Sequence, residues 1–211
     1  MASDNPQGAS GSGDGRSFAG TIAVFGSSRR DEESALYVEA YELGRLLSRA
    51  GYAVLSGGYH GSMGAVSRGA AEAGGHVIGV TCALFDPLPP NRWLTEEVKA
   101  ADLMERLAIM MRRADGFVAV RGGIGTLSEV TLAWSLLPWP ARQGGQTRSF
   151  RGKPLILLGD DWQPVVSALR QNTDLGSSIA GLARMASTPA EAVAVLASEP
   201  LPTPPGPPLQ G

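Results

Sequence analysis

Residues 116–137 read GFVAVRGGIGTLSEVTLAWSLL, and this stretch determines how the rest of the chain is interpreted. The short apolar run at 116–120 predicts a buried strand, and the apolar positions of 126–137 predict a helix. Three glycines lie between them at 122, 123 and 125. Glycine allows a ligand to approach the main chain, and the free N–H groups at a helix start attract anions. The stretch therefore predicts a strand, a phosphate-binding turn and a helix in succession.

The same alternation of strand and helix continues on both sides of this stretch. Strands are predicted at 21–26, 52–58, 76–81, 92–100 (the weakest), 116–120 and 153–159, and helices at 31–51, 62–73, 102–114, 126–137 and 161–171. Near-continuous Val, Ile and Leu in the strands favours a parallel sheet covered on both faces. We therefore expect an α/β fold, a single Rossmann-like doubly wound domain over 20–199 with a mostly parallel sheet.

The two ends of the chain have a different composition. Residues 1–19 are rich in Gly, Ser and Asp, and residues 200–211 are dominated by Pro and Gly. Such segments bury too little apolar surface to offset their ordering entropy, so both are predicted to be disordered tails. Residues 141–152 are predicted to form a long polar loop.

Composition restricts the class of function. The chain has 211 residues, a formal net charge of -2 and a pI near 5.7, which disfavours nucleic acid as a partner. The single Cys82 cannot form an intrachain disulfide, and the start of the chain lacks the features of a secretory signal. Apolar runs are too short to span a membrane. We therefore expect a cytoplasmic protein that binds a small anionic ligand and binds neither nucleic acid nor a membrane.

Three predicted strands end in loops that could bind this ligand. They are Gly26–Arg29, SGGYHGSMGA at 56–65 and RGGIGTLSE at 121–129. In open parallel sheets, ligands bind outside the carboxyl ends of the strands. None of these loops matches the Walker A pattern, and the first strand is not followed by GxGxxG. Any one of them could be only a tightly packed turn, but the three together favour a phosphate site.

Glu129 has two interpretations. Thr126 and Glu129 fit a T-x-x-E capping box, in which both side chains satisfy N–H groups at the helix start. Alternatively, Glu129 is a functional carboxylate beside the phosphate, which would need a neighbouring cation, and Arg106 on the preceding helix is the candidate.

The runs at 104–129, 56–80 and 24–29 together resemble the LOG ("lonely guy") family, over roughly residues 20–197. The family signature PGGxGTxxE follows an arginine by a fixed spacing, and here Arg106 and Glu129 are 23 positions apart. The resemblance implies a Rossmann-like homodimer that hydrolyses a nucleoside 5'-monophosphate, such as a cytokinin riboside monophosphate, to free base and ribose 5-phosphate. It implies no metal and no cofactor. The catalytic residues it implies are Arg106 and Glu129. The implied substrate-binding residues are Ser27, Gly57, Gly58, Gly122, Gly123, Gly125 and Thr126.

The reaction suits these residue types. Cleavage of a glycosidic bond passes through an oxocarbenium-like ribose, which a carboxylate can stabilise while it orients the attacking water. The resemblance assigns this role to Glu129, and it assigns Arg106 the role of anchoring the substrate and keeping Glu129 ionised.

Three positions depart from the family signature. Arg121 stands where the family has proline, Leu107 replaces a lysine and Ser128 replaces a glutamate. TLSEV also resembles molybdenum-cofactor carrier proteins, so a non-catalytic nucleotide or molybdenum-cofactor carrier is the alternative function. A DNA-processing relative would need a basic groove, which the net charge disfavours.

Overall fold

The computed structural model describes residues 18–29, 32–140, 149–199 and 201. Within these ranges, seven strands form one sheet in the order β4-β3-β2-β1-β5-β6-β7, and every neighbouring pair is parallel. The strands are β1 (Gly20–Phe25), β2 (Tyr52–Ser56), β3 (Val77–Cys82), β4 (Glu96–Ala100), β5 (Gly116–Ala119), β6 (Leu155–Leu158) and β7 (Ala183–Ala186). The predicted α/β doubly wound fold is confirmed.

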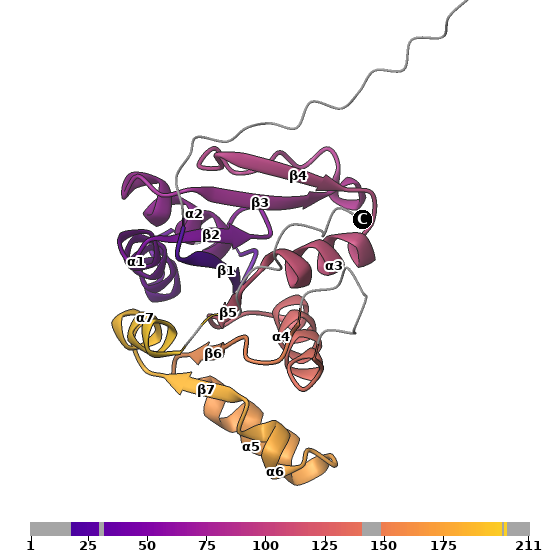
Figure 1. Ribbon diagram of the computed structural model, residues 1–211. Helices are drawn as coiled ribbons and strands as arrows, with labels where there is room; N and C mark the ends of the chain where they lie inside the picture. The colour runs from indigo at the N-terminus through magenta and orange to yellow at the C-terminus, as the bar shows by residue number, and fades with distance from the viewer. Residues whose placement is uncertain (1–17, 30–31, 141–148, 200, 202–211) are drawn as a thin grey trace, which may run out of the picture.

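Helices cover both faces of the sheet (Figure 1). One face carries α1 (Ala35–Arg49), α2 (Ser62–Glu72) and α7 (Pro189–Ser198). The other carries α3 (Leu103–Arg113), α4 (Ile124–Leu136), α5 (Trp162–Asn172) and the short α6 (Ser177–Ala180). A 3₁₀ turn, η1 (Ala83–Phe85), follows β3.

The central strands β1, β2, β5 and β6 are almost entirely apolar because both of their faces are buried, whereas the edge strand β4 reads EEVKA. In β1, Ile22 and Val24 pack beneath α1, α2 and α7, whereas Ala23 and Phe25 pack beneath the opposite helices. This is the period of two expected of a pleated strand. Full burial of each large side chain contributes roughly 1.5–3 kcal/mol, so both core layers depend on the same continuous apolar run.

Several elements differ from the sequence predictions. The strand β7 and the helices α6 and α7 were not predicted. The strand reads ARMA and has no β-branched residue, and α6 has only four residues. Pairing with the buried strand β6 holds β7 in the sheet. The predicted tails lie outside the described residues except for 18–19 and 201, and residues 141–148 of the predicted loop also lie outside them. Ala19 is ordered by a hydrogen bond from its N–H to the Gly51 carbonyl at 3.0 Å.

The direction of winding reverses between β1 and β5. Strands β2, β3 and β4 extend from one side of β1, whereas β5, β6 and β7 extend from the other. The loops that follow β1, β2 and β5 lie at the carboxyl ends of adjacent strands, and Val120 donates its N–H to the Phe25 carbonyl at 3.0 Å across the reversal. This is where ligands bind in folds of this architecture.

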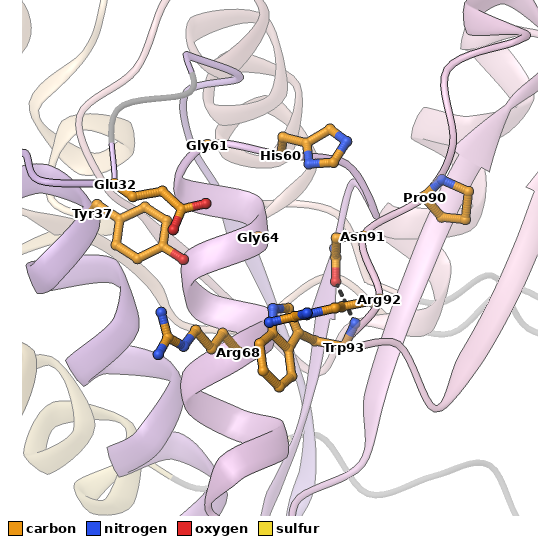
Figure 2. A pocket seen from close by; sticks show the side chains of 10 residues that line it. All are labelled: Glu32, Tyr37, His60, Gly61, Gly64, Arg68, Pro90, Asn91, Arg92 and Trp93. Atoms are coloured by element: carbon orange, nitrogen blue, oxygen red, sulfur yellow. Dashed lines mark hydrogen bonds between the residues drawn. The ribbon is translucent and has the colours of Figure 1, made fainter.

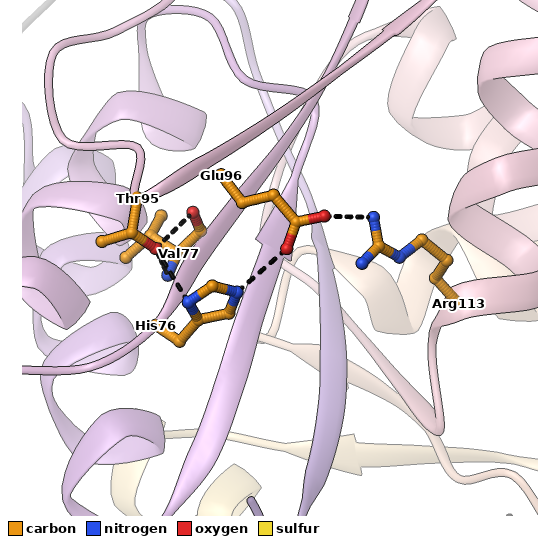
Figure 3. Close-up of polar contacts among 5 residues, drawn as sticks. All are labelled: His76, Val77, Thr95, Glu96 and Arg113. Carbon is orange, nitrogen blue, oxygen red and sulfur yellow. Dashed lines mark hydrogen bonds and ion pairs between the residues drawn. The ribbon is translucent and has the colours of Figure 1, made fainter. Parts of the chain in front are cut away.

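A polar network at the opposite end of the sheet fixes α3 against β3 and β4 (Figure 3). His76 contacts the Thr95 hydroxyl through Nδ1 at 3.0 Å and Glu96 Oε2 through Nε2 at 3.0 Å. Arg113, the last residue of α3, donates to Glu96 Oε1 at 2.6 Å. The network therefore holds the carboxyl end of the helix that carries Arg106.

No helix in the described ranges is both long enough and apolar enough to cross a lipid bilayer.

Candidate functional site

Arg106 is buried under the carboxyl ends of β2 and β3. It lies in the first turn of α3. The N-cap residue of this helix, Asp102, accepts the Glu105 N–H through its side chain at 2.8 Å. Only 6% of Arg106 is exposed. Its Nε donates to the Val80 carbonyl at 2.8 Å and its Nη2 donates to the Gly57 carbonyl at 3.2 Å. These two bonds fix the orientation of the guanidinium.

Glu129 is the carboxylate that Arg106 faces. The Nη1 of Arg106 lies 3.5 Å from Oε1 of Glu129, a long contact for a hydrogen bond between opposite charges. Burial raises the pKa of Glu129 to about 7, while the charge and hydrogen bond of Arg106 act to lower it. Arg106 therefore acts in the predicted direction, but burial has the larger effect and the pKa of Glu129 lies above its ordinary value.

The capping-box interpretation of Thr126 and Glu129 is also wrong. Helix α4 begins at Ile124, two residues before the predicted start, and its N-cap is Gly123. The Leu127 N–H bonds to the Gly123 carbonyl at 3.0 Å, so Thr126 lies inside the first turn. Thr126 and Glu129 are both buried and are three residues apart, which places them on one helix face. Glu129 points toward Arg106 rather than back to the start of its helix.

The glycines of this loop differ in what surrounds them. A Cβ at Gly122 would collide with the Thr126 side chain, but a Cβ at Gly123 or Gly125 would meet nothing within 4 Å. The chain itself therefore gives no steric reason for glycine at 123 and 125. Because the first N–H groups of a helix have no partner inside it, those of the exposed start of α4 are free to bind an anion.

The predicted Gly57 and Gly58 belong to the same site through Arg106. A side chain at Gly57 would overlap the Arg106 guanidinium, so glycine allows the arginine to reach the Gly57 carbonyl. Gly58 has a φ of +78° and donates its N–H to the Ser56 hydroxyl at 3.2 Å. This turn therefore lies beside Arg106.

Ser27 connects the loop after β1 to the start of α2. Its carbonyl accepts the Ser62 N–H at 3.0 Å and the Ser62 hydroxyl at 3.1 Å, and its own hydroxyl accepts the Arg29 N–H at 3.1 Å. The three predicted loops thus meet at one end of the sheet. Whether the predicted substrate-binding residues contact a ligand stays a prediction.

Several contributors could not be identified from sequence. The Val80 carbonyl that orients Arg106 has no side-chain signature. Asn91, which is 6% exposed, bonds through Nδ2 to the Tyr59 carbonyl at 3.0 Å and has no motif around it. Arg121 lies at the surface and pairs with Asp161 at 3.4 Å.

Within the described residues, His, Cys, Asp and Glu side chains do not gather in any group of three suited to a metal ion.

Known proteins are similar to this chain in sequence over part of its length. A probable cytokinin riboside 5'-monophosphate phosphoribohydrolase of Oryza sativa subsp. japonica is 38% identical over 132 residues, which is 61% of this chain and 57% of the relative. The cytokinin riboside 5'-monophosphate phosphoribohydrolase of Arabidopsis thaliana is 37% identical over 126 residues, or 58% of this chain and 59% of the relative. The chain thus spans less than two thirds of the length of these relatives.

Solved structures match over more of the chain. The molybdenum cofactor carrier protein of Chlamydomonas reinhardtii has a TM-score of 0.64 and 28% identity, covering 84% of this chain and 96% of its own. The DNA processing protein A of Helicobacter pylori, at 16% identity and a TM-score of 0.56, shares the fold alone. The sequence model of the SLOG cluster4 family matches residues 19–137, more than half of the chain. Together with the curated relatives, this match confirms the LOG-like resemblance, and the chain belongs to the SLOG cluster4 family.

Proposed function

We propose that this protein hydrolyses the N-glycosidic bond of a nucleoside 5'-monophosphate and releases the free base and ribose 5-phosphate. The observation that carries the proposal is the buried pair of Arg106 and Glu129, 3.5 Å apart, beside an exposed helix start with two sterically unconstrained glycines. The names of the curated relatives support the same reaction, with a cytokinin riboside monophosphate as the model substrate.

Each part of the arrangement suits one part of the substrate. The N–H groups at the start of α4 would donate hydrogen bonds to the 5'-phosphate, as helix starts do to anions. In its ionised form, Glu129 would stabilise the positive charge that develops on the ribose, or orient the water that attacks the anomeric carbon. A pKa of about 7 allows Glu129 to take up and release a proton near neutral pH. Arg106 would anchor the substrate and limit the rise of that pKa.

The test is base release from a panel of nucleoside 5'-monophosphates that includes N6-isopentenyladenosine monophosphate, with products separated by chromatography. Glu129→Gln should lower turnover by at least about 100-fold, because loss of one charge-stabilising or proton-transferring group has that effect. Glu105→Gln, an exposed carboxylate on α3, is the matched control and should retain activity. Wild-type turnover in folded Glu129→Gln would overturn the proposal.

The second candidate is a carrier that binds a phosphorylated pterin or nucleotide without hydrolysing it. The observation in its favour is structural likeness, because molybdenum cofactor carrier structures match 84% and 85% of this chain at 28% and 25% identity. A carrier would bind its ligand saturably and release no base. Ligand that co-purifies with the protein, together with no base release across the panel, would favour this candidate.

Two further expectations accompany the proposed hydrolase. The protein is proposed to act as a homodimer, and its predicted compartment remains the cytoplasm.

A further inference from the structure

Asn91 is a buried polar residue in the segment that leads to β4, and the proposed hydrolytic site assigns it no role. Figure 2 shows it at the wall of a cavity of about 520 Å³ between α1, α2 and the segment 90–93. Only 6% of Asn91 is exposed, and a buried amide destabilises a protein unless its donors and its acceptor are bonded. The partners of this side chain therefore indicate what it holds in place.

Asn91 is bonded to the turn after β2 through its main chain and its side chain. Its N–H donates to the Gly58 carbonyl at 2.8 Å, and its Nδ2 donates to the Tyr59 carbonyl at 3.0 Å. Its side-chain oxygen accepts the Trp93 N–H at 3.1 Å, the bond drawn as a dashed line in Figure 2. Asn91 thus ties its own segment to the turn at 57–59.

Two buried hydroxyls hold the same turn from its other side. The Gly58 N–H donates to the Ser56 hydroxyl at 3.2 Å, and the hydroxyls of Ser56 and Ser67 are hydrogen-bonded at 3.3 Å. Ser67, on α2, also accepts from Asn91 Nδ2 at 3.3 Å. The turn is therefore enclosed by a polar network, in which the loss of one member leaves buried polar atoms of the others unpaired.

Tyr59 anchors the turn to β3. Its hydroxyl donates to the Cys82 carbonyl at 3.0 Å and accepts the Cys82 N–H at 2.8 Å. The same strand supplies the Val80 carbonyl, to which Arg106 Nε donates at 2.8 Å. The turn and Arg106 are thus fixed to one strand.

Gly57 connects this network to the hydrolytic site. Its carbonyl accepts Arg106 Nη2 at 3.2 Å. A Cβ at Gly57 would overlap the guanidinium and would also lie 2.6 Å from the Met63 sulfur, so the guanidinium occupies a narrow space between the turn and α2. The position of Arg106 is therefore set by the main chain of the turn.

The contact between Arg106 and Glu129 is longer than an unrestrained pair of this kind would be. Nη1 and Oε1 are 3.5 Å apart, whereas a free guanidinium and carboxylate approach to about 2.7–2.9 Å. The Val80 and Gly57 carbonyls hold two of the three guanidinium nitrogens. These two bonds account for the long contact, because they restrain Arg106 from closing on Glu129.

We propose that Asn91 is a positioning residue, which fixes the turn at 57–59 and so holds Arg106 at the Gly57 carbonyl and short of a close ion pair with Glu129. Its importance for turnover rests on the proposed hydrolase. A carboxylate in a close ion pair has a low pKa and does not readily take up a proton near neutral pH. Among the described residues, Arg106 is the charged side chain that acts on the pKa of Glu129, and burial is the larger influence.

The test follows the titration of the Glu129 carboxyl carbon by NMR, in protein labelled at the glutamate side chains, from about pH 4 to pH 9. Glu129→Gln identifies the signal. Asn91→Ala should move the midpoint to a pH lower by about 0.5 or more, because the loosened turn lets Arg106 approach the carboxylate and admits water. Ser56→Ala, which loosens the turn without changing the segment 90–93, should move it in the same direction.

Thr188→Ala is the control. It removes the N-cap bond to the Glu191 N–H of α7, which packs on the face of the sheet opposite α3 and α4. This variant should lose stability, as N-cap variants do, but keep the wild-type midpoint. An equal shift in Thr188→Ala would overturn the proposal, because the shift would then follow any loss of stability.

An unchanged or higher midpoint in folded Asn91→Ala would also overturn it. If Asn91→Ala does not fold, the same result in Ser56→Ala has that meaning. In base release, Asn91→Ala should lower the maximal turnover about tenfold or more, since small displacements of a positioned group have effects of this size. The NMR midpoint does not depend on turnover. A shifted midpoint in a protein that releases no base would therefore reject the hydrolase and leave the role of Asn91 supported.

Discussion

Glu129 is subject to two opposing influences, burial and the charge of Arg106. Burial favours the neutral acid and raises its pKa to about 7, while the guanidinium 3.5 Å away favours the carboxylate. The folded protein therefore holds this proton more tightly than the unfolded chain, in which the ordinary pKa is 4.5. Loss of this proton should therefore raise the activity of the protein and lower its stability.

We expect turnover to rise as pH increases through about 7, because the ionised carboxylate is the active form. Between about pH 4.5 and pH 7 the stability of the wild type should fall relative to Glu129→Gln. The contribution of Glu129 is greatest below the unfolded pKa of 4.5 and is lost as pH rises to the folded pKa of about 7. The expected change in the free energy of unfolding is up to about 3 kcal/mol. Denaturant unfolding and initial rates measured from about pH 4 to pH 9 provide the check. A stability difference that does not vary with pH would contradict it.

Two glycines of the site should respond to alanine in opposite directions. Gly125 lies in the first turn of α4 with open space around it, so Gly125→Ala should raise stability by about 0.5–1 kcal/mol through helix propensity. The added methyl group would lie over the N–H groups and should weaken nucleotide binding. Gly57→Ala should lower both stability and turnover, because its methyl group would displace the Arg106 guanidinium. Thermal unfolding and Michaelis constants of the two variants test this contrast. Equal loss of stability in both would show that the space at Gly125 is not open.

Among the helices and strands, α4 determines the geometry of the site mainly through the position of its first residue. The helix begins at Ile124 because the backbone turns at Gly123, and this places the N–H groups at the mouth of the site. Had it begun at Thr126, as the T-x-x-E pattern suggested, Glu129 would have satisfied the helix end rather than face Arg106. A difference of two residues in the helix boundary therefore changes the role of the carboxylate.

The position of α3 depends on the network of His76, Glu96 and Arg113 at the far end of the sheet. Burial raises the pKa of Glu96. The hydrogen bonds from Arg113 and His76 together lower this pKa by more than burial raises it, so it lies below the ordinary value of 4.5. Glu96 therefore contributes stability above about pH 4.5 that is lost as pH falls below it.

Glu96→Gln should destabilise the protein by at most about 1 kcal/mol near neutral pH, since the partners are about one-third exposed. The effect should shrink in acid. Urea denaturation at two pH values measures it, with Asp174→Asn, an exposed carboxylate on the segment after α5, as the control. Equal destabilisation at both pH values would argue against a charge effect.

At the scale of the whole molecule, the helices that carry the site also expose apolar side chains. Met104 on α3 is 72% exposed, Ile124 on α4 is 80% exposed and Trp139, just after α4, is 65% exposed. Large exposed apolar groups close to a site often mark a protein contact. They are the surface that the proposed homodimer would bury.

We expect sedimentation analysis to give a dimer, and Met104→Glu should weaken it at least tenfold, because a buried charge without a partner disfavours association. Val38→Glu changes a side chain that is 59% exposed on α1, on the other face of the sheet, and should leave the dimer intact. A monomer in the wild type at all concentrations, or equal effects of the two substitutions, would reject this interface.

The sequence by itself determined the features that depend on the local pattern of apolar and polar side chains. The alternation of apolar runs with amphipathic stretches specified the parallel strands β1 to β6 and the helices α1 to α5, because side-chain periodicity directly reports which faces are buried. The spacing of Arg106 and Glu129, interpreted through family resemblance, identified the pair that the fold brings together.

The tertiary structure decided everything that depends on neighbours distant in the chain. The strand β7 exists because β6 offers it a partner, not because its four residues favour a strand. The start of α4, the pKa of Glu129 and the cavity between α1, α2 and Asn91 likewise arise from packing between segments that no local pattern connects. Burial and contact are properties of the assembled chain, and for that reason they cannot be obtained from periodicity alone.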